Sequence, residues 1–180
     1  CQLDSHFVNL LEVKVENTRF ARVDSDSIDN LIAKEEKIRP ELSETEQEDL
    51  SVIFQAVLPK ENQYYVQADN LGENAAPILI TQSEFMRRYR EMSAMGGGMN
   101  FYGEMPAMYN ITVNMQNPLV TRIMAAAADH KSDLEAFAGG NEMLRQVTDL
   151  ALLANGMLKG KDLSDFIARS AKVVEDAYLK

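Results

Sequence analysis

The 180-residue sequence contains few of the residues on which catalytic and metal sites depend: it has one cysteine, two histidines and no tryptophan. His6 and His130 are far apart in the chain, and no pair of histidines or cysteines has metal-ligand spacing. The triple glycine Gly96–Gly98 is no phosphate loop, because it lacks the Gly-Lys-Ser/Thr ending and follows a predicted helix. We therefore expect no catalytic residue, metal site or cofactor in this chain.

Other absences suggest where the protein works. A single cysteine cannot form an internal disulfide, so a reducing, cytoplasmic setting is expected. No apolar run reaches the ~20 residues needed to span a bilayer, and no signal peptide is visible. Lysine and arginine number 18 against 28 acidic residues, a net charge of -10, which argues against nucleic-acid and membrane partners. The chain opens on Cys1, and we interpret it as a piece of a longer protein.

Methionine, in contrast, is concentrated in one stretch. Seven of the ten methionines lie between Ser83 and Met115, together with several aromatic residues. Thr81 and Glu84 have capping-box spacing, which predicts a helix beginning there, and Gly96–Gly98 should end it. Phe85, Tyr89 and Met92 would share one face of this helix.

Three interpretations of this Met-rich helix remain open. Its apolar face is either packed in the core or serves as an adaptable contact surface, since methionine fits many partner shapes. The third is a Cu(I) site built from thioethers, although no cysteine or histidine supports it. The methionines that would form such a site are Met95, Met99, Met105 and Met108.

The remaining pattern predicts an α+β fold in which a small three-stranded sheet is flanked by helices. We expect two extended pieces within residues 3–23 joined by a turn at Asn17, and a linker or loop over Ser25–Pro40. Ser43 and Glu46 predict a capped helix that stops before Pro59. The later predicted elements are strands at Tyr64–Ala68, Pro77–Thr81 and Met108–Met115, a helix opening at Pro118, and a polar connection over His130–Gly140.

Two helices should finish the chain as a hairpin. Asn141 is the predicted cap of the first, which ends at Asn155-Gly156, and Asp162 is the predicted cap of the second. Their apolar stripes are long for a solitary hairpin. Either they pack on the chain's own sheet, or two hairpins pair into a four-helix bundle.

Three segments together resemble one family. ITQSEFMRRYREMSAM, ITVNMQNPLVTRIM and LRQVTDLALLANGM occur in the order and spacing found in the C-terminal domain of heat-shock protein 90 chaperones of the bacterial HtpG type. The match runs through Ser43–Val174, and the opening QLDSHFVNLLEV resembles the join from the middle domain. This resemblance implies that residues 1–40 end a middle domain or linker and residues 41–180 form the C-terminal dimerisation and client-contact domain.

The resemblance also implies functions that the residue pattern does not establish. The full-length relative would be an ATP-dependent chaperone that binds ATP and Mg²⁺ in an N-terminal domain. The present chain would have no enzymatic activity; its partners would be a second copy of itself and non-native client proteins. The runner-up is a purely structural homo-oligomerisation domain in which the Met-rich helix is buried.

The resemblance assigns two sets of site residues. The implied client-binding residues are Phe85, Met86, Tyr89, Met92, Met95, Met99 and Phe101. The implied dimer-interface residues are Leu144, Val147, Leu150, Ala151, Leu153, Leu163, Phe166, Ile167 and Val174.

Overall fold

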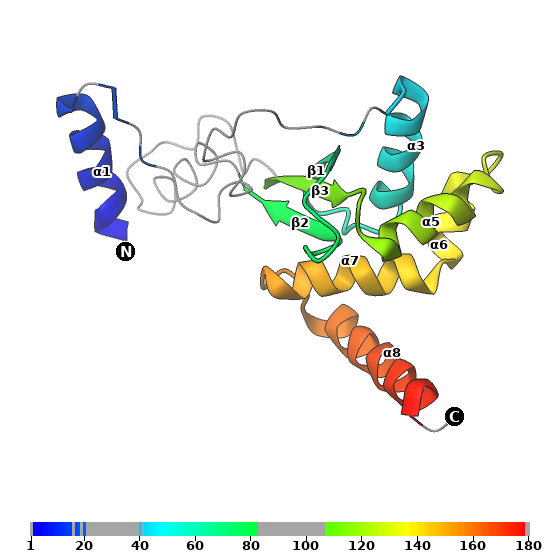
Figure 1. Cartoon of the computed structure of the whole chain (residues 1–180). Helices are drawn as coiled ribbons and strands as arrows, with labels where there is room; N and C mark the ends of the chain where they lie inside the picture. Colours follow the sequence, from blue (N-terminus) through cyan, green and yellow to red (C-terminus); the bar gives the residue numbers. More distant parts are fainter. Residues whose placement is uncertain are drawn as a thin grey trace. The chain divides into compact units, whose positions relative to one another are not determined.

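The structure, a computed structural model, describes residues 2–15, 17–18, 20, 40, 42–82 and 107–178 (Figure 1). Within these ranges it has six helices and a three-stranded sheet, which confirms the predicted α+β class. The chain forms two compact units. The first comprises Cys1–Lys37, Glu61–Gln63 and Thr81–Tyr109, and the second comprises Ile38–Lys60, Tyr64–Ile80 and Asn110–Lys180.

In the first unit, Gln2–Lys14 forms helix α1, so the extended piece predicted there is wrong. The reason lies in a pattern that supports two periods. Leu11, Val13 and Val15 alternate as in a strand, but Leu3, Phe7 and Leu10 recur at helical spacing, and the helix prevails. The predicted turn at Asn17 is confirmed by its left-handed backbone, with φ 59°.

The second unit begins with helix α3, Glu44–Gln55. The predicted capping box is confirmed: the Ser43 hydroxyl accepts from the Glu46 N–H at 3.3 Å, and the Glu46 carboxylate accepts from the Ser43 N–H at 2.9 Å. The helix ends before Pro59, as predicted, and its core face carries fully buried Leu50, Ile53 and Phe54.

The three predicted strands are confirmed as β1 (Gln63–Asp69), β2 (Ile78–Thr81) and β3 (Met108–Asn114), in the order β1-β3-β2. The sheet is mixed. The Gln63 N–H donates to Ala107 and the Met115 N–H donates to Asp69, so β1 and β3 run parallel. The Asn114 N–H at the end of β3 donates to Pro77 just before β2, so these two strands are antiparallel.

A buried amide holds the loop between β1 and β2. Asn114 is fully buried, and its Oδ1 accepts from the N–H groups of Leu71 and Gln116. Its Nδ2 donates to the carbonyls of Gly72 at 2.8 Å and Ala76 at 3.3 Å. One side chain therefore satisfies four backbone groups that would otherwise need other partners.

Two helices follow the sheet. Helix α5 (Pro118–Ala128) opens at Pro118 as predicted, capped by Asn117. The predicted polar connection over His130–Gly140 is partly wrong, because Leu134–Gly140 forms helix α6, whose first turn is capped by Asp133. Helix α6 packs against α3 and α7, and this packing supplies support that its short, glycine-containing sequence does not reveal.

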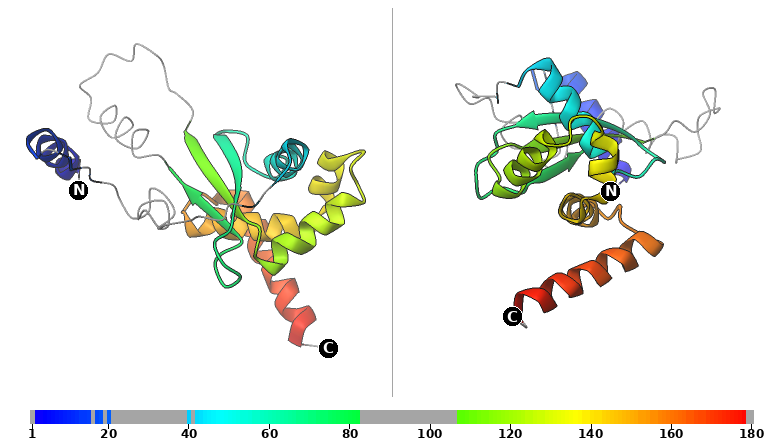
Figure 2. Two further views of the ribbon diagram at one scale, coloured as in Figure 1. Left: turned by 45° about the horizontal axis from the view of Figure 1, so that its top comes forward. Right: turned by 90° about the vertical axis from the view of Figure 1, so that its right-hand side faces the viewer.

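The core of the second unit lies between the sheet and its helices. In Figure 2, α3, α5 and α7 lie around the sheet. The large residues that these elements bury almost completely are Leu50, Ile53, Phe54, Ile111, Val113, Val120, Ile123, Leu144 and Leu152.

Candidate interaction surface

Helix α7 (Glu142–Ala154) has one face in the core. The predicted cap is confirmed, since Asn141 Oδ1 accepts from the Leu144 N–H at 2.9 Å, and Gly156 follows the helix with φ +65°. The predicted interface residues Leu144, Val147 and Ala151 are exposed by only 0%, 6% and 8%. They are thus buried by the chain itself.

The opposite side of α7 exposes a second apolar stripe. Met143, Leu150 and Leu153 are exposed by 40%, 52% and 38%, and their spacing of seven and three residues puts them on one side of the helix. We call these three residues the α7 stripe. A helix that is apolar on two sides needs packing partners on both sides, and the core of this unit packs against only one of them.

Helix α8 (Gly160–Tyr178) has a similar surplus of apolar surface. It begins two residues before Asp162, so the prediction that Asp162 caps it is wrong. The Asp162 carboxylate lies in the first turn, where its negative charge interacts favourably with the positive end of the helix dipole. Among its 19 residues only Phe166 is buried. Figures 1 and 2 show α8 beginning near the end of α7 and running out beyond the rest of its unit.

Three of the four large apolar residues that α8 exposes are aligned. Ile167, Val174 and Tyr178 are exposed by 57%, 56% and 83% and lie within roughly 40° of one another around the helix. We call these three residues the α8 stripe. Spacing of seven and four residues is typical of a seam that packs against another helix.

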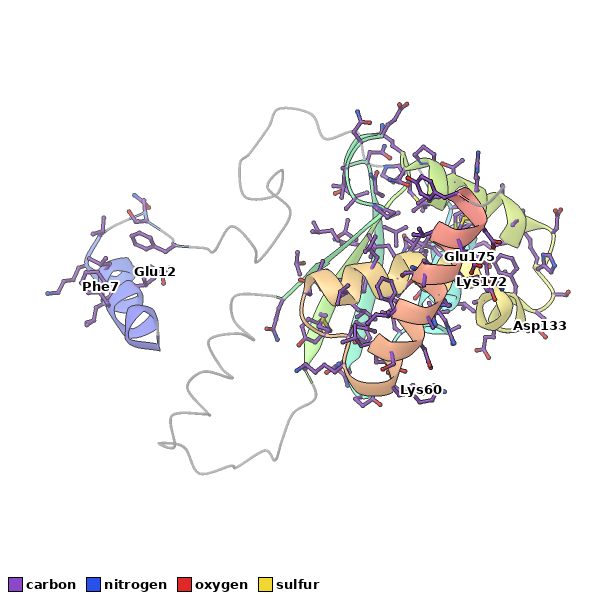
Figure 3. All side chains as sticks on the ribbon, turned by 90° about the horizontal axis from the view of Figure 1, so that it is seen from below. Phe7, Glu12, Lys60, Asp133, Lys172 and Glu175 are labelled. Atoms are coloured by element: carbon purple, nitrogen blue, oxygen red, sulfur yellow. The ribbon has the colours of Figure 1, made fainter. Side chains whose placement is uncertain are left out.

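Two polar pairs join α8 to α7. The Gln146 amide nitrogen donates to the Ser170 hydroxyl at 2.7 Å, and the Arg169 guanidinium forms an ion pair with Asp149. Burial raises the pKa of the Asp149 carboxyl above its ordinary value, and the Arg169 charge offsets part of this rise. Figure 3 shows α8 with its labelled residues Lys172 and Glu175.

The predicted interface residues thus fall into two groups. Phe166 joins the three core residues of α7, while Leu150, Leu153, Ile167 and Val174 are exposed and Leu163 is half-buried. Their part in a dimer stays a prediction. The predicted set lacks Met143 and Tyr178, although their sequence spacing from Leu150 and Val174 places them on the same stripes.

All seven implied client-binding residues, and the predicted Met-rich helix, lie outside the described residues. Of the methionines proposed for Cu(I), only Met108 is described; it begins β3 and is 44% exposed. The described ranges contain no group of three histidine, cysteine, aspartate or glutamate residues that could hold a metal ion. No helix described here is long and apolar enough to cross a bilayer.

A hollow of about 520 Å³ lies at the turn between α5 and α6. His130 lines it, with its ring 5.0 Å from Phe137 and its Nδ1 bonded to the Ala126 carbonyl at 3.0 Å. Asp133 also lines it, but Asp133 Oδ1 already caps α6. Since these groups have structural partners, the stripes of α7 and α8 are the stronger candidate site.

The chain is related to molecular chaperones of the heat-shock protein 90 family. No family model matches it, so the relationship comes from individual proteins. The chain is 36% identical to chaperone protein HtpG of Bacteroides fragilis over 231 aligned positions, which cover 96% of this chain and 34% of that protein. The same protein of Porphyromonas gingivalis is 36% identical, and that of Bacteroides thetaiotaomicron 34% identical, with the same coverage.

The resemblance to HtpG-type chaperones predicted from the sequence is therefore confirmed. The chain spans about a third of the length of the curated relatives it matches. The 231 aligned positions exceed the 180 residues of this chain, so the relatives have additional residues within the matched stretch.

Proposed function

We propose that this chain is the dimerisation and client-contact domain of an ATP-dependent chaperone of the heat-shock protein 90 family, acting in the cytoplasm. ATP and Mg²⁺ would bind in a different, N-terminal part of the parent protein. The observation that carries the proposal is the pair of exposed apolar stripes on the C-terminal hairpin. The relationship to HtpG chaperones supports the same conclusion.

The stripes suit pairing with an identical copy. In a twofold dimer each α8 stripe would meet its own counterpart, so the surface has to be self-complementary. The stripe positions Ile167, Val174 and Tyr178 carry no charge and would not repel one another. Two hairpins would together form four helices around a shared apolar centre, which covers the second side of α7.

Client contact would come from the Met-rich segment, residues 83–106. Unbranched, polarisable methionine side chains adapt to different apolar partners, which suits proteins that are not yet folded. A dimer would present two such segments, and the second contact would form at a raised effective concentration. Because each contact orders flexible side chains, single contacts should be weak.

Dimerisation can be tested by sedimentation equilibrium at micromolar concentration. The unmodified chain should form a dimer, and Ile167→Glu or Val174→Glu should convert it to a monomer, because each places two charges in the shared centre. Ala168→Glu is the matched control, since it adds the same charge to an exposed position of α8 away from the stripe. A monomeric unmodified chain would refute the proposal.

Client contact can be tested with Phe85→Ser, Tyr89→Ser and Met92→Ser combined in the same chain. We expect the variant to remain folded by circular dichroism but to bind a denatured model protein less tightly. If it unfolds instead, these residues belong to the core. Strong hydrogen-exchange protection over residues 85–101 would likewise favour the structural oligomerisation domain over a client-binding one.

A further inference from the structure

The contact between α7 and α8 is polar at one defined place. Asp149 pairs with Arg169, and one turn earlier on α7 the Gln146 amide donates to Ser170. Beyond Ser170, α8 exposes Val173 by 58%, and α7 exposes Met143 by 40% before Gln146. Nearer the turn of the hairpin, Leu150 and Ile167 are also exposed, by 52% and 57%, so exposed apolar side chains lie on both sides of the two polar pairs.

The Asp149–Arg169 pair is unusual because it is largely buried. The side chain of Asp149 is 12% exposed and that of Arg169 is 22% exposed. The ion pair Lys161–Asp165 on the same helix has exposures of 86% and 49%. A buried pair loses much of its attraction to desolvation, but its two groups must meet in one geometry, so it contributes more to orientation than to stability.

We propose that the Asp149–Arg169 pair is a positioning contact that fixes the angle at which α8 leaves α7, and so places the α8 stripe for pairing with a second copy. This inference rests on the proposed dimer. If the pair were lost, α8 could still pack through Phe166, but its outer half would sample several directions. Each dimer would then have to select one of them, which lowers the apparent affinity.

The proposal implies a dependence on pH. Asp149 faces the charges of Arg169 and Asp162 from α8 and of Arg145 from α7, and burial raises the pKa of its carboxyl. A raised pKa means that the folded chain holds this proton more tightly, so protonating Asp149 by itself favours folding as pH falls toward its ordinary value of 3.8. Protonation also removes the Asp149 charge that pairs with Arg169. Acid should therefore weaken the dimer through this group without unfolding the chain.

The test uses Asp149→Asn, which keeps the side-chain shape but removes the charge. Asp165→Asn is the matched control, because it removes one charge from the exposed pair on α8. Sedimentation equilibrium at pH 7.5 and pH 5 gives the dimer dissociation constant. We expect Asp149→Asn to raise this constant about ten-fold at pH 7.5 and to reduce its pH dependence, with the control within about two-fold of the unmodified chain.

A second measurement reports the angle directly. Spin labels at Glu142→Cys and Glu175→Cys, in a Cys1→Ser background diluted with unlabelled chain, report the distance between the outer ends of α7 and α8. The distribution should be narrow in the unmodified chain and broad in Asp149→Asn. Arg169→Gln, which removes the more exposed residue of the ion pair, should broaden the distribution in the same way. This variant replaces Asp149→Asn in the test if Asp149→Asn does not fold.

The outcomes separate this inference from the proposed function. A folded Asp149→Asn chain with unchanged dimer affinity and an unchanged, narrow distance distribution would overturn the positioning role while leaving the dimer intact. If the unmodified chain is monomeric at both pH values, the proposed dimer fails and the inference about pairing fails with it. Unequal broadening in Asp149→Asn and Arg169→Gln would also count against a pair that acts as one unit.

Discussion

Phe166 and Ile167 are neighbours on α8, yet the structure gives them opposite surroundings: Phe166 is 7% exposed and Ile167 is 57% exposed. Replacing each with alanine should therefore affect different equilibria. Phe166→Ala should destabilise the chain itself, and Ile167→Ala should leave the single chain intact but weaken its pairing. The comparison is well matched, because both substitutions keep good helix formers in the same turn.

The size of the Phe166 effect follows from its burial. Truncating a buried phenylalanine removes apolar contacts and leaves a cavity, which costs about 3–5 kcal/mol of unfolding free energy. The loss should be measured by urea denaturation on a Val174→Glu background at fixed concentration, because association of the chains would otherwise add to the apparent stability.

The Ile167 effect follows from the surface that remains to be buried. Isoleucine to alanine removes three carbon groups at about 0.8 kcal/mol each when fully buried. With 57% of the residue still exposed in the single chain, about 1.4 kcal/mol is available per copy, or about 3 kcal/mol per twofold dimer. The dimer dissociation constant should rise about one hundred-fold.

Sedimentation equilibrium and urea denaturation of both variants complete the test. The reasoning would be refuted if Phe166→Ala changed only the dissociation constant and Ile167→Ala changed only the stability of the single chain. It would also fail if Ile167→Ala left the dissociation constant within about two-fold of the unmodified value, since the α8 stripe would then lie outside the interface.

Other parts of the fold give four further predictions. Asn114→Leu should lower the unfolding free energy by about 4 kcal/mol in urea denaturation, because it removes four hydrogen bonds worth roughly 1 kcal/mol each; a loss below about 1 kcal/mol would contradict this. Ser43→Ala should lower the unfolding free energy by about 1 kcal/mol, because it removes the N-terminal cap of α3. The Ser43 backbone N–H lowers the pKa of Glu46 from 4.5, so stability from this carboxylate is present above pH 4.5 and disappears as pH falls through the lowered pKa; Glu46→Gln should flatten that part of a stability profile. Gly156→Ala should lower the unfolding free energy by about 1 kcal/mol, because Gly156 has φ +65°. Gly139→Ala, inside α6, should not destabilise the chain, and thermal melts of both variants measure the difference.

Local signals made most of the fold predictable. The side chains of Ser43, Asn117 and Asn141 each accept a hydrogen bond from the first turn of the helix that follows. A few neighbouring residues therefore suffice to locate these helix starts. The strands were equally visible as short β-branched and aromatic runs between turn residues. These elements needed no knowledge of distant contacts.

The errors arose where distant packing decides. The first residues of the chain satisfy both a strand period and a helix period, and the sequence alone does not decide between them. Helix α6 has seven residues, too few to be stable alone, and depends on packing against α3 and α7. Asp162 has the chemistry of a helix cap, but α8 begins two residues earlier at Gly160.

The candidate surface was predicted as a region but not as a face. Apolar residues occupy two sides of α7, and sequence spacing groups Leu144 with Ala151 and Leu150 with Met143 without indicating which side meets the core. The Asp149–Arg169 pair was missed because its members are twenty positions apart on different helices.

The distribution of exposed apolar residues argues for a specific partner. Helix α5 buries Val120 and Ile123 and turns Thr121 and Arg122 to solvent, and its one large exposed apolar side chain is Leu119, at 40%. Helices α7 and α8 instead expose seven large apolar residues, six of them in two aligned stripes. Scattered exposed leucines and valines are ordinary on protein surfaces, but alignment along two adjacent helices creates a surface that another helix pair can cover. Because Ile167, Val174 and Tyr178 form a line without charge, an identical stripe could cover this surface, and for that reason we propose a second copy of the chain as the partner of the hairpin.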